Sequence, residues 1–61
     1  MTHDIQNQNG QYIEDVKLRD EIVNAIERDV TSLVYNNKSV EIVKHYVDSD
    51  GNKETIVHVD F

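Results

Sequence analysis

The residues with the clearest chemical potential lie near the C-terminus, in the stretch HYVDSDGNKETIVHV at residues 45–59. Asp48 and Asp50 precede Gly51 there, and His45 and His58 lie on either side of them. Carboxylates at this spacing could bind calcium, and two imidazoles could bind zinc or respond to pH. The stretch is therefore either a metal site or the turn of a β-hairpin.

The calcium alternative fails at both ends of the required loop. An EF-hand loop needs oxygen ligands at positions 1, 3 and 5, glycine at position 6 and glutamate at position 12. With Gly51 at position 6, Tyr46 falls at position 1 and Val57 at position 12, and neither side chain is a calcium ligand. The acidic residues of this stretch are better explained as turn formers.

Two segments that flank this turn are rich in β-branched and aromatic residues, KSVEIVKHYV at 38–47 and KETIVHVDF at 53–61. Such composition predicts two strands, and a tight turn at Asp50-Gly51 would join them as a hairpin. In the register that best segregates apolar from polar residues, Ile42 pairs with Val59 and Tyr46 pairs with Thr55. The predicted core face comprises Val40, Ile42, Tyr46, Val57, Val59 and Phe61. The predicted second face comprises Glu41, Val43, His45, Val47, Glu54, Ile56, His58 and Asp60, with His45 and His58 as diagonal neighbours.

The segment at residues 11–35 predicts one amphipathic helix, because its apolar residues recur three and four positions apart. Asn36 and Asn37 are expected to end this helix, since asparagine tolerates the left-handed backbone conformation. Residues 1–10 are polar and show no periodicity, so they are expected to be a flexible N-terminal tail before a single domain at 11–61. The predicted apolar stripe comprises Tyr12, Val16, Val23, Ile26, Val30 and Leu33.

The predicted fold class is α+β, with one amphipathic helix followed by an antiparallel β-hairpin, in the order α-β-β. A two-stranded sheet under one helix is marginally stable, and a chain of 61 residues buries only about 60% of its unfolded surface. There is no cysteine, so no disulfide can compensate. We therefore expect a homodimer in which two hairpins share one sheet.

The composition restricts the partners of this chain. Its net charge is −6, from twelve acidic and six basic residues, which argues against direct binding to nucleic acid or to anionic membranes. It allows a protein partner, including a basic one. No apolar run approaches the roughly 20 residues of a membrane helix, and the N-terminus lacks the pattern of a signal peptide, so a cytoplasmic location is predicted.

The sequence predicts a small acidic regulatory or inhibitory protein that is not an enzyme, needs no cofactor or metal, and acts by protein–protein interaction. Its two glycines form no phosphate-binding loop, and no serine has an identifiable base beside it. In the sharpest form of this hypothesis the acidic face of the helix imitates nucleic acid. One alternative is an assembly module whose main role is homo-oligomerisation, and a weaker one is a ligand or metal binder that uses the histidine face. The candidate partner-binding residues are Glu14, Asp20, Glu21, Glu27, Val43, His45, Ile56 and His58.

Overall fold

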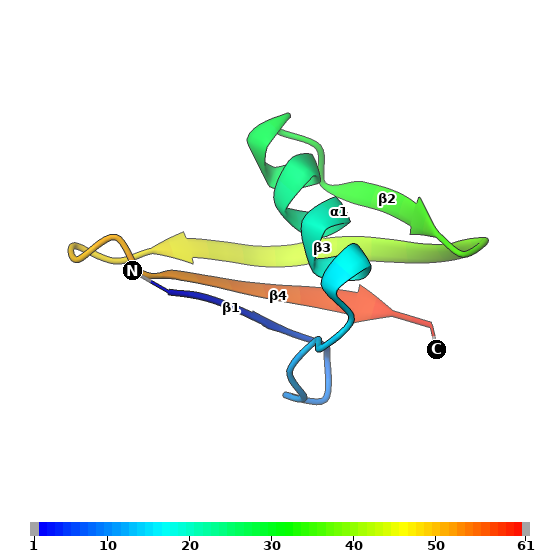
Figure 1. Cartoon of the computed structure of the whole chain (residues 1–61), viewed down its shortest axis with the longest axis horizontal. Coiled ribbons are helices and arrows are strands. Elements are labelled where there is room, and N and C mark those ends of the chain that lie inside the picture. The colour runs from blue at the N-terminus through cyan, green and yellow to red at the C-terminus, as the bar shows by residue number, and fades with distance from the viewer. Residues whose placement is uncertain (1, 61) are drawn as a thin grey trace.

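A computed structural model describes residues 2–60 of the chain. The elements follow the order β1 (His3–Gln6), α1 (Val16–Glu27), β2 (Ser32–Tyr35), β3 (Lys38–Val47) and β4 (Lys53–Val59). The four strands form one mixed sheet in the order β1-β4-β3-β2, in which β1 is parallel to β4 and the other pairs are antiparallel. Helix α1 lies across one face of this sheet (Figure 1). The α-β-β prediction is therefore wrong, because it lacked β1 and β2.

Strand β1 lies within residues 1–10, where the sequence predicted a flexible tail. Ile5 is fully buried in the core and pairs with Thr55 of β4. The backbone N–H of Ile13 donates to the carbonyl of Ile5 at 2.8 Å, so the segment before α1 covers the outer edge of β1. A four-residue strand with one buried apolar side chain has no detectable periodicity, and its partner lies about fifty residues away in sequence.

Helix α1 is much shorter than the predicted helix over residues 11–35. It begins after Asp15, whose carboxylate accepts hydrogen bonds from the backbone N–H groups of Lys17 and Leu18. Its buried stripe comprises Leu18, Ile22 and Ala25. Tyr12, Val16 and Val30, which belonged to the predicted stripe, are exposed. The predicted helix includes residues 11–15 and 28–35, which are not helical in the structure.

Asn36 and Asn37 form the turn between β2 and β3 and do not end a helix. Both have positive φ, 51° and 63°, and they lie between the paired residues Tyr35 and Lys38. Two left-handed residues in a two-residue loop match the twist of a hairpin. The same conformation can end a helix, so the asparagine pair was compatible with both structures.

The pairing of β3 with β4 differs from the predicted register. Val47 pairs with Lys53, so the connection spans residues 48–52 and not a tight turn at Asp50-Gly51. Asp48 is confirmed as a turn former, since its Oδ1 accepts from the backbone N–H groups of Asp50 and Asn52 at 2.9 Å. Phe61, the predicted partner of Val40, lies outside the described residues, and Val40 pairs with Val59.

A β-bulge between Ile42 and Lys44 changes which face each residue of β3 occupies. Before the bulge Ile42 pairs with Val57, and after it His45 pairs with Thr55. Residues that pair directly point to the same side of a sheet, so His45 lies on the helix face with the buried Thr55. The prediction placed His45 beside His58 on the other face, and this is wrong because the bulge adds one residue to β3.

The core lies between α1 and the middle of the sheet. It comprises Ile5, Ile13, Leu18, Ile22, Val40, Val57 and Val59. A helix is only about 10 Å wide, whereas a strand of the length of β3 extends for about 33 Å. Because α1 crosses the strands, β3 and β4 extend well beyond it toward the left of Figure 1. Among residues 2–60 no helix is long and apolar enough to cross a membrane.

The expected dimer rested on the open edges of an isolated hairpin. Within this chain β1 occupies the outer edge of β4, and β2 occupies part of the edge of β3 through Lys38–Glu41. Both edges on which the shared-sheet argument rested are therefore partly occupied, that of β4 over Lys53–Ile56, and the homodimer stays a prediction.

Candidate functional site

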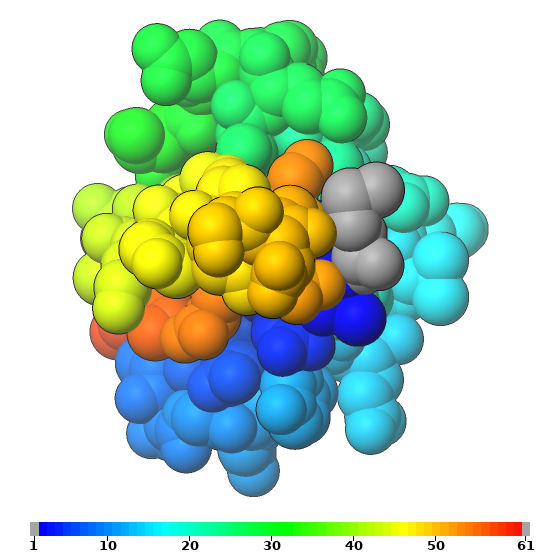
Figure 2. All heavy atoms as spheres, turned by 90° about the vertical axis from the view of Figure 1, so that its left-hand side faces the viewer, coloured from blue at the N-terminus to red at the C-terminus, as the bar shows by residue number. Residues whose placement is uncertain are grey.

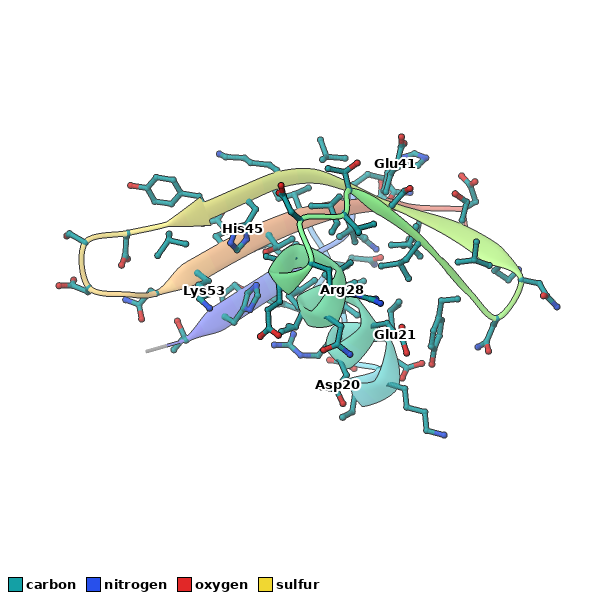
Figure 3. The ribbon with its side chains drawn as sticks, turned by 90° about the horizontal axis from the view of Figure 1, so that it is seen from above. Asp20, Glu21, Arg28, Glu41, His45 and Lys53 are labelled. Atoms are coloured by element: carbon teal, nitrogen blue, oxygen red, sulfur yellow. The ribbon has the colours of Figure 1, made fainter. Side chains whose placement is uncertain are left out.

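Titratable and basic side chains gather on the helix face of the sheet, at the end that α1 leaves uncovered. We call this group the basic cluster, and it comprises His3 of β1, Arg19 of α1, His45 of β3 and Lys53 of β4. His3 pairs with Lys53 across β1 and β4, and His45 pairs with Thr55 across β3 and β4. Figure 3 shows His45 and Lys53 close to one another on the side of the sheet that carries α1.

The hydroxyl of Thr55 joins the two histidines of the basic cluster. Its Oγ lies 2.8 Å from Nε2 of His3 and 2.9 Å from Nδ1 of His45. A hydroxyl donates only one proton, so Thr55 donates to at most one of the two imidazoles and accepts from the other. Thr55 is fully buried, and the hydroxyl therefore connects three strands and orients two rings without presenting a nucleophile to a substrate.

The charges around His3 disfavour its protonation. Partial burial is the largest cause that lowers the pKa of His3, followed by the positive charges of His45, Lys53 and Arg19. Asp4 acts in the opposite direction, and it alternates with His3 onto the other face of the sheet. The basic cluster is thus a locally positive region in a chain of net charge −6.

The guanidinium of Arg19 supports this region from the helix. Its two terminal nitrogens donate to the carbonyl of His3 at 2.8 Å and to the carbonyl of Ile13 at 3.1 Å. Arg19 therefore fixes β1 against α1 and adds positive charge beside His3.

A second feature lies beside the cluster, on the edge of β3. Strand β2 pairs with β3 only through Lys38–Glu41, and one further bond joins the N–H of Ile42 to the carbonyl of Thr31 at 2.8 Å. Within residues 2–60, residues 43–47 therefore have no neighbouring strand on the side away from β4, and we call this segment the β3 edge. In Figure 1, β3 runs past the end of β2 toward the connection with β4.

The β3 edge carries exposed apolar side chains. Val43, Tyr46 and Val47 are 64%, 56% and 48% exposed. Figure 2, which views this end of the molecule, shows the end of β3 (yellow), the start of β4 (orange) and β1 (blue) meeting at one surface. The β3 edge and the basic cluster share His45, so together they form one continuous candidate binding surface.

The predicted acidic residues lie on a different side of the molecule. Asp20, Glu21 and Glu27 are exposed on α1, and Glu14 is exposed in the segment before it. Glu21 and Glu27 line a shallow surface hollow of about 350 Å³ together with Asn24 and Arg28. The structure thus brings two predicted carboxylates together but places a cation beside them (Figure 3).

The other predicted residues are divided between the two faces of the sheet. Val43 lies at the bulge, and His45 faces the helix side. Ile56 and His58 of β4 alternate with Thr55 and Val57, so they face away from α1. Nε2 of His58 lies 3.3 Å from Oδ1 of Asp60.

Sequence reasoning missed four members of this site, His3, Arg19, Lys53 and Thr55. A weak signal was present, since HDI at 3–5 and KET at 53–55 each place an acidic residue directly after a basic or titratable one. Their proximity depends on the parallel pairing of β1 with β4, which no local pattern specifies.

The described residues contain no group of three or more histidine, aspartate or glutamate side chains that could hold a metal ion. The pair of His3 and His45 has ring centroids 5.8 Å apart, with two cations close by. Comparisons with known protein families, with curated proteins and with solved structures found no match for this chain.

Proposed function

We propose that this chain is a small, non-enzymatic regulatory protein that binds an extended segment of a partner protein along the β3 edge. The observation that carries this proposal is that two features occur together on the β3 edge. The longest unpaired stretch of strand edge within residues 2–60 also carries three of the exposed large apolar side chains. A strand added there would gain backbone hydrogen bonds and bury those side chains.

The protection of the other edges supports this choice. Residues 11–13 cover the second half of β1, with an antiparallel bridge between Gln6 and Tyr12, and Arg19 donates to the carbonyl of His3 in the first half. Strand β2 has an open outer edge, but it is only four residues long. Proteins commonly protect edges by covering or shortening them, and the β3 edge has neither protection.

The charge of the β3 edge indicates which partners it favours. Residues 43–47 include Lys44 and His45 and no acidic residue, although the whole chain has a net charge of −6. A partner segment with acidic and apolar residues would therefore be complementary to it. Holding such a segment as a strand withholds it from other interactions, and this would make the protein a regulator.

The nucleic-acid mimicry hypothesis remains a prediction, as does the assembly alternative. Lys17 lies on the same helix as the acidic residues and Arg28 caps its C-terminal end, so the charge of that surface is mixed. No observation favours this surface over the β3 edge as a binding site.

A displayed library of random peptides would test the proposal. Peptides selected on the wild-type chain would be measured against Val43→Asp/Val47→Asp, which places two negative charges on the edge and opposes an acidic partner. The control is Glu21→Gln/Glu27→Gln, which changes the charge of the helix surface by the same number of units. All four residues are exposed, so both variants are expected to fold.

We expect the edge variant to lose binding and the helix variant to retain it. Hydrogen exchange of the backbone amides at 43–47 should slow in the complex. Loss of binding in the helix variant alone would overturn the proposal in favour of the acidic surface. Failure to select any peptide, together with self-association in sedimentation equilibrium, would favour the assembly module.

A further inference from the structure

The basic cluster and the acidic residues of its strands lie on opposite faces of the sheet. The acidic residues of β1, β3 and β4 are Asp4, Glu41 and Glu54, and all three lie on the face away from α1. On the helix face at the uncovered end, His3 pairs with Lys53, and Lys53 in turn pairs with Val47. An anion that approaches from the helix face therefore meets positive or titratable groups from three strands. Lys53 also lines a second hollow, which it shares with the carboxylates of Asp4, Asp48 and Glu54.

The orientation of the two imidazoles leaves one nitrogen of each ring available. Nε2 of His3 and Nδ1 of His45 contact the Thr55 hydroxyl. Nδ1 of His3 and Nε2 of His45 have no hydrogen-bond partner among residues 2–60. A hollow of about 240 Å³ beside His3 is lined by Thr2, His3, Gly51 and Lys53. His3 and the Lys53 ammonium thus line this open space, and the ring of His45 lies next to that of His3, with 5.8 Å between the ring centroids.

We propose that His3, His45 and Lys53 form a carboxylate-binding site that receives an acidic side chain of the partner strand. This inference rests on the proposed function, because the partner strand must lie on the β3 edge. His45 belongs to that edge, and a partner residue paired with it would point to the same face of the sheet. The site would therefore select a segment with aspartate or glutamate at the position opposite His45.

Binding at this site should take up protons. Without an anion, the charges that face His3 are those of His45 on β3, Lys53 on β4, Arg19 on α1 and Asp4 on its own strand. Protonating His3 would place a partly buried positive charge beside these cations. A bound carboxylate offsets these charges, so the protonated state is favoured in the complex and affinity should rise as the pH falls from 8 to 6.

Two probes distinguish carboxylate binding at His3, His45 and Lys53 from the addition of a partner strand at the β3 edge. The first is a pair of peptides, acetyl-Ser-Thr-Val-Glu-Val-Thr-Ser-amide and its analogue with glutamine in place of glutamate. The second is sodium acetate, titrated against sodium chloride at constant ionic strength. Both are followed by NMR of the backbone amides and of the three histidine rings, at pH 6 and at pH 8. His58 faces the other side of the sheet beside Asp60 and serves as an internal control.

We expect the glutamate peptide to bind about three- to fivefold more tightly than the glutamine peptide at pH 6, in the range of a partly exposed ion pair. The difference should shrink at pH 8. His3→Gln should abolish the pH dependence, and His58→Gln should leave it intact. Acetate should shift the rings of His3 and His45 more than chloride does, and leave the ring of His58 unchanged.

The outcomes distinguish the two proposals. Equal binding of both peptides at both pH values would overturn the carboxylate site and leave strand addition standing. An acetate response without peptide binding would support the site, assign it to free small carboxylates and overturn strand addition. No response of His3 and His45 to either probe would overturn the inference.

Discussion

The middle and the end of one sheet face can be compared directly, because the same three strands build both. In the middle, Ile5, Val40 and Val57 are fully buried beneath α1. At the end, residues of the same strands are His3, His45 and Lys53, of which His45 and Lys53 are exposed. Thr55 marks the boundary, since it is as buried as the core but makes the hydrogen bonds of the basic cluster.

Whether α1 covers a part of this sheet face determines whether the side chains there form the core or contact solvent. A helix that crosses the strands covers only about 10 Å of their length. Side chains beneath it exclude water and stabilise the fold by burial. Side chains beyond it remain in contact with solvent, where they can titrate and meet a partner. A small domain can in this way hold a core and a binding surface on one face.

The largest expected effect is on the stability of the covered half. Ile5→Ala should reduce the free energy of unfolding by about 2–4 kcal/mol, because it removes buried methyl groups and leaves a cavity in the core. Chemical denaturation would measure this loss. The control is Val47→Ala at the uncovered end, which should change stability by less than about 0.5 kcal/mol. Similar values for the two variants would mean that β1 is not part of the core.

A smaller effect is expected at the boundary between the two halves. Thr55→Val keeps the shape of the side chain but removes the hydroxyl that joins His3 and His45, and should cost about 1 kcal/mol at pH 8. Thr55→Ser keeps the hydroxyl, so it should preserve the ring positions in NMR spectra although it loses a buried methyl group. If Thr55→Val leaves both histidine rings unshifted, the hydroxyl does not orient them.

The smallest expected effect is the pH dependence of stability at the uncovered end. Folding lowers the pKa of His3 from 6.5, so the unfolded chain binds a proton more readily than the folded chain. The stabilisation of the folded state that neutral His3 provides is complete above pH 6.5 and is lost as the pH falls below 6.5. Thermal unfolding between pH 7.5 and 5.5 should therefore show a decreasing Tm, and His3→Gln should flatten this decrease. His58→Gln should not, and an equal effect of both variants would contradict the role of His3.

Part of this structure could be predicted from local patterns. Alternating β-branched residues located β3 and β4, and the helical spacing of Val23 and Ile26 indicated a helix around them. Asp48 acts as the predicted turn former. Among the candidate site residues, Val43 and His45 lie on the β3 edge, but they were expected beside Ile56 and His58.

The remaining features depend on contacts that local patterns do not encode. The bulge near Val43 reverses the faces of His45 and Tyr46, and hydrophobic alternation alone predicted the unbroken register. Asn36 and Asn37 suit both a helix end and a hairpin turn, so only the pairing of Tyr35 with Lys38 decides between them.

The sequence by itself determined the chemistry available to this protein: an acidic chain without cysteine, with its strand-forming residues in the C-terminal half and three histidines. Only the tertiary structure decided which of these residues meet. The parallel pairing of β1 with β4 brings His3 to Thr55, and the bulge in β3 brings His45 to the same hydroxyl. The physical reason is that each strand fixes only the alternation of its own side chains, whereas strand order and register are set by burying Ile5 and Val57 together beneath one short helix.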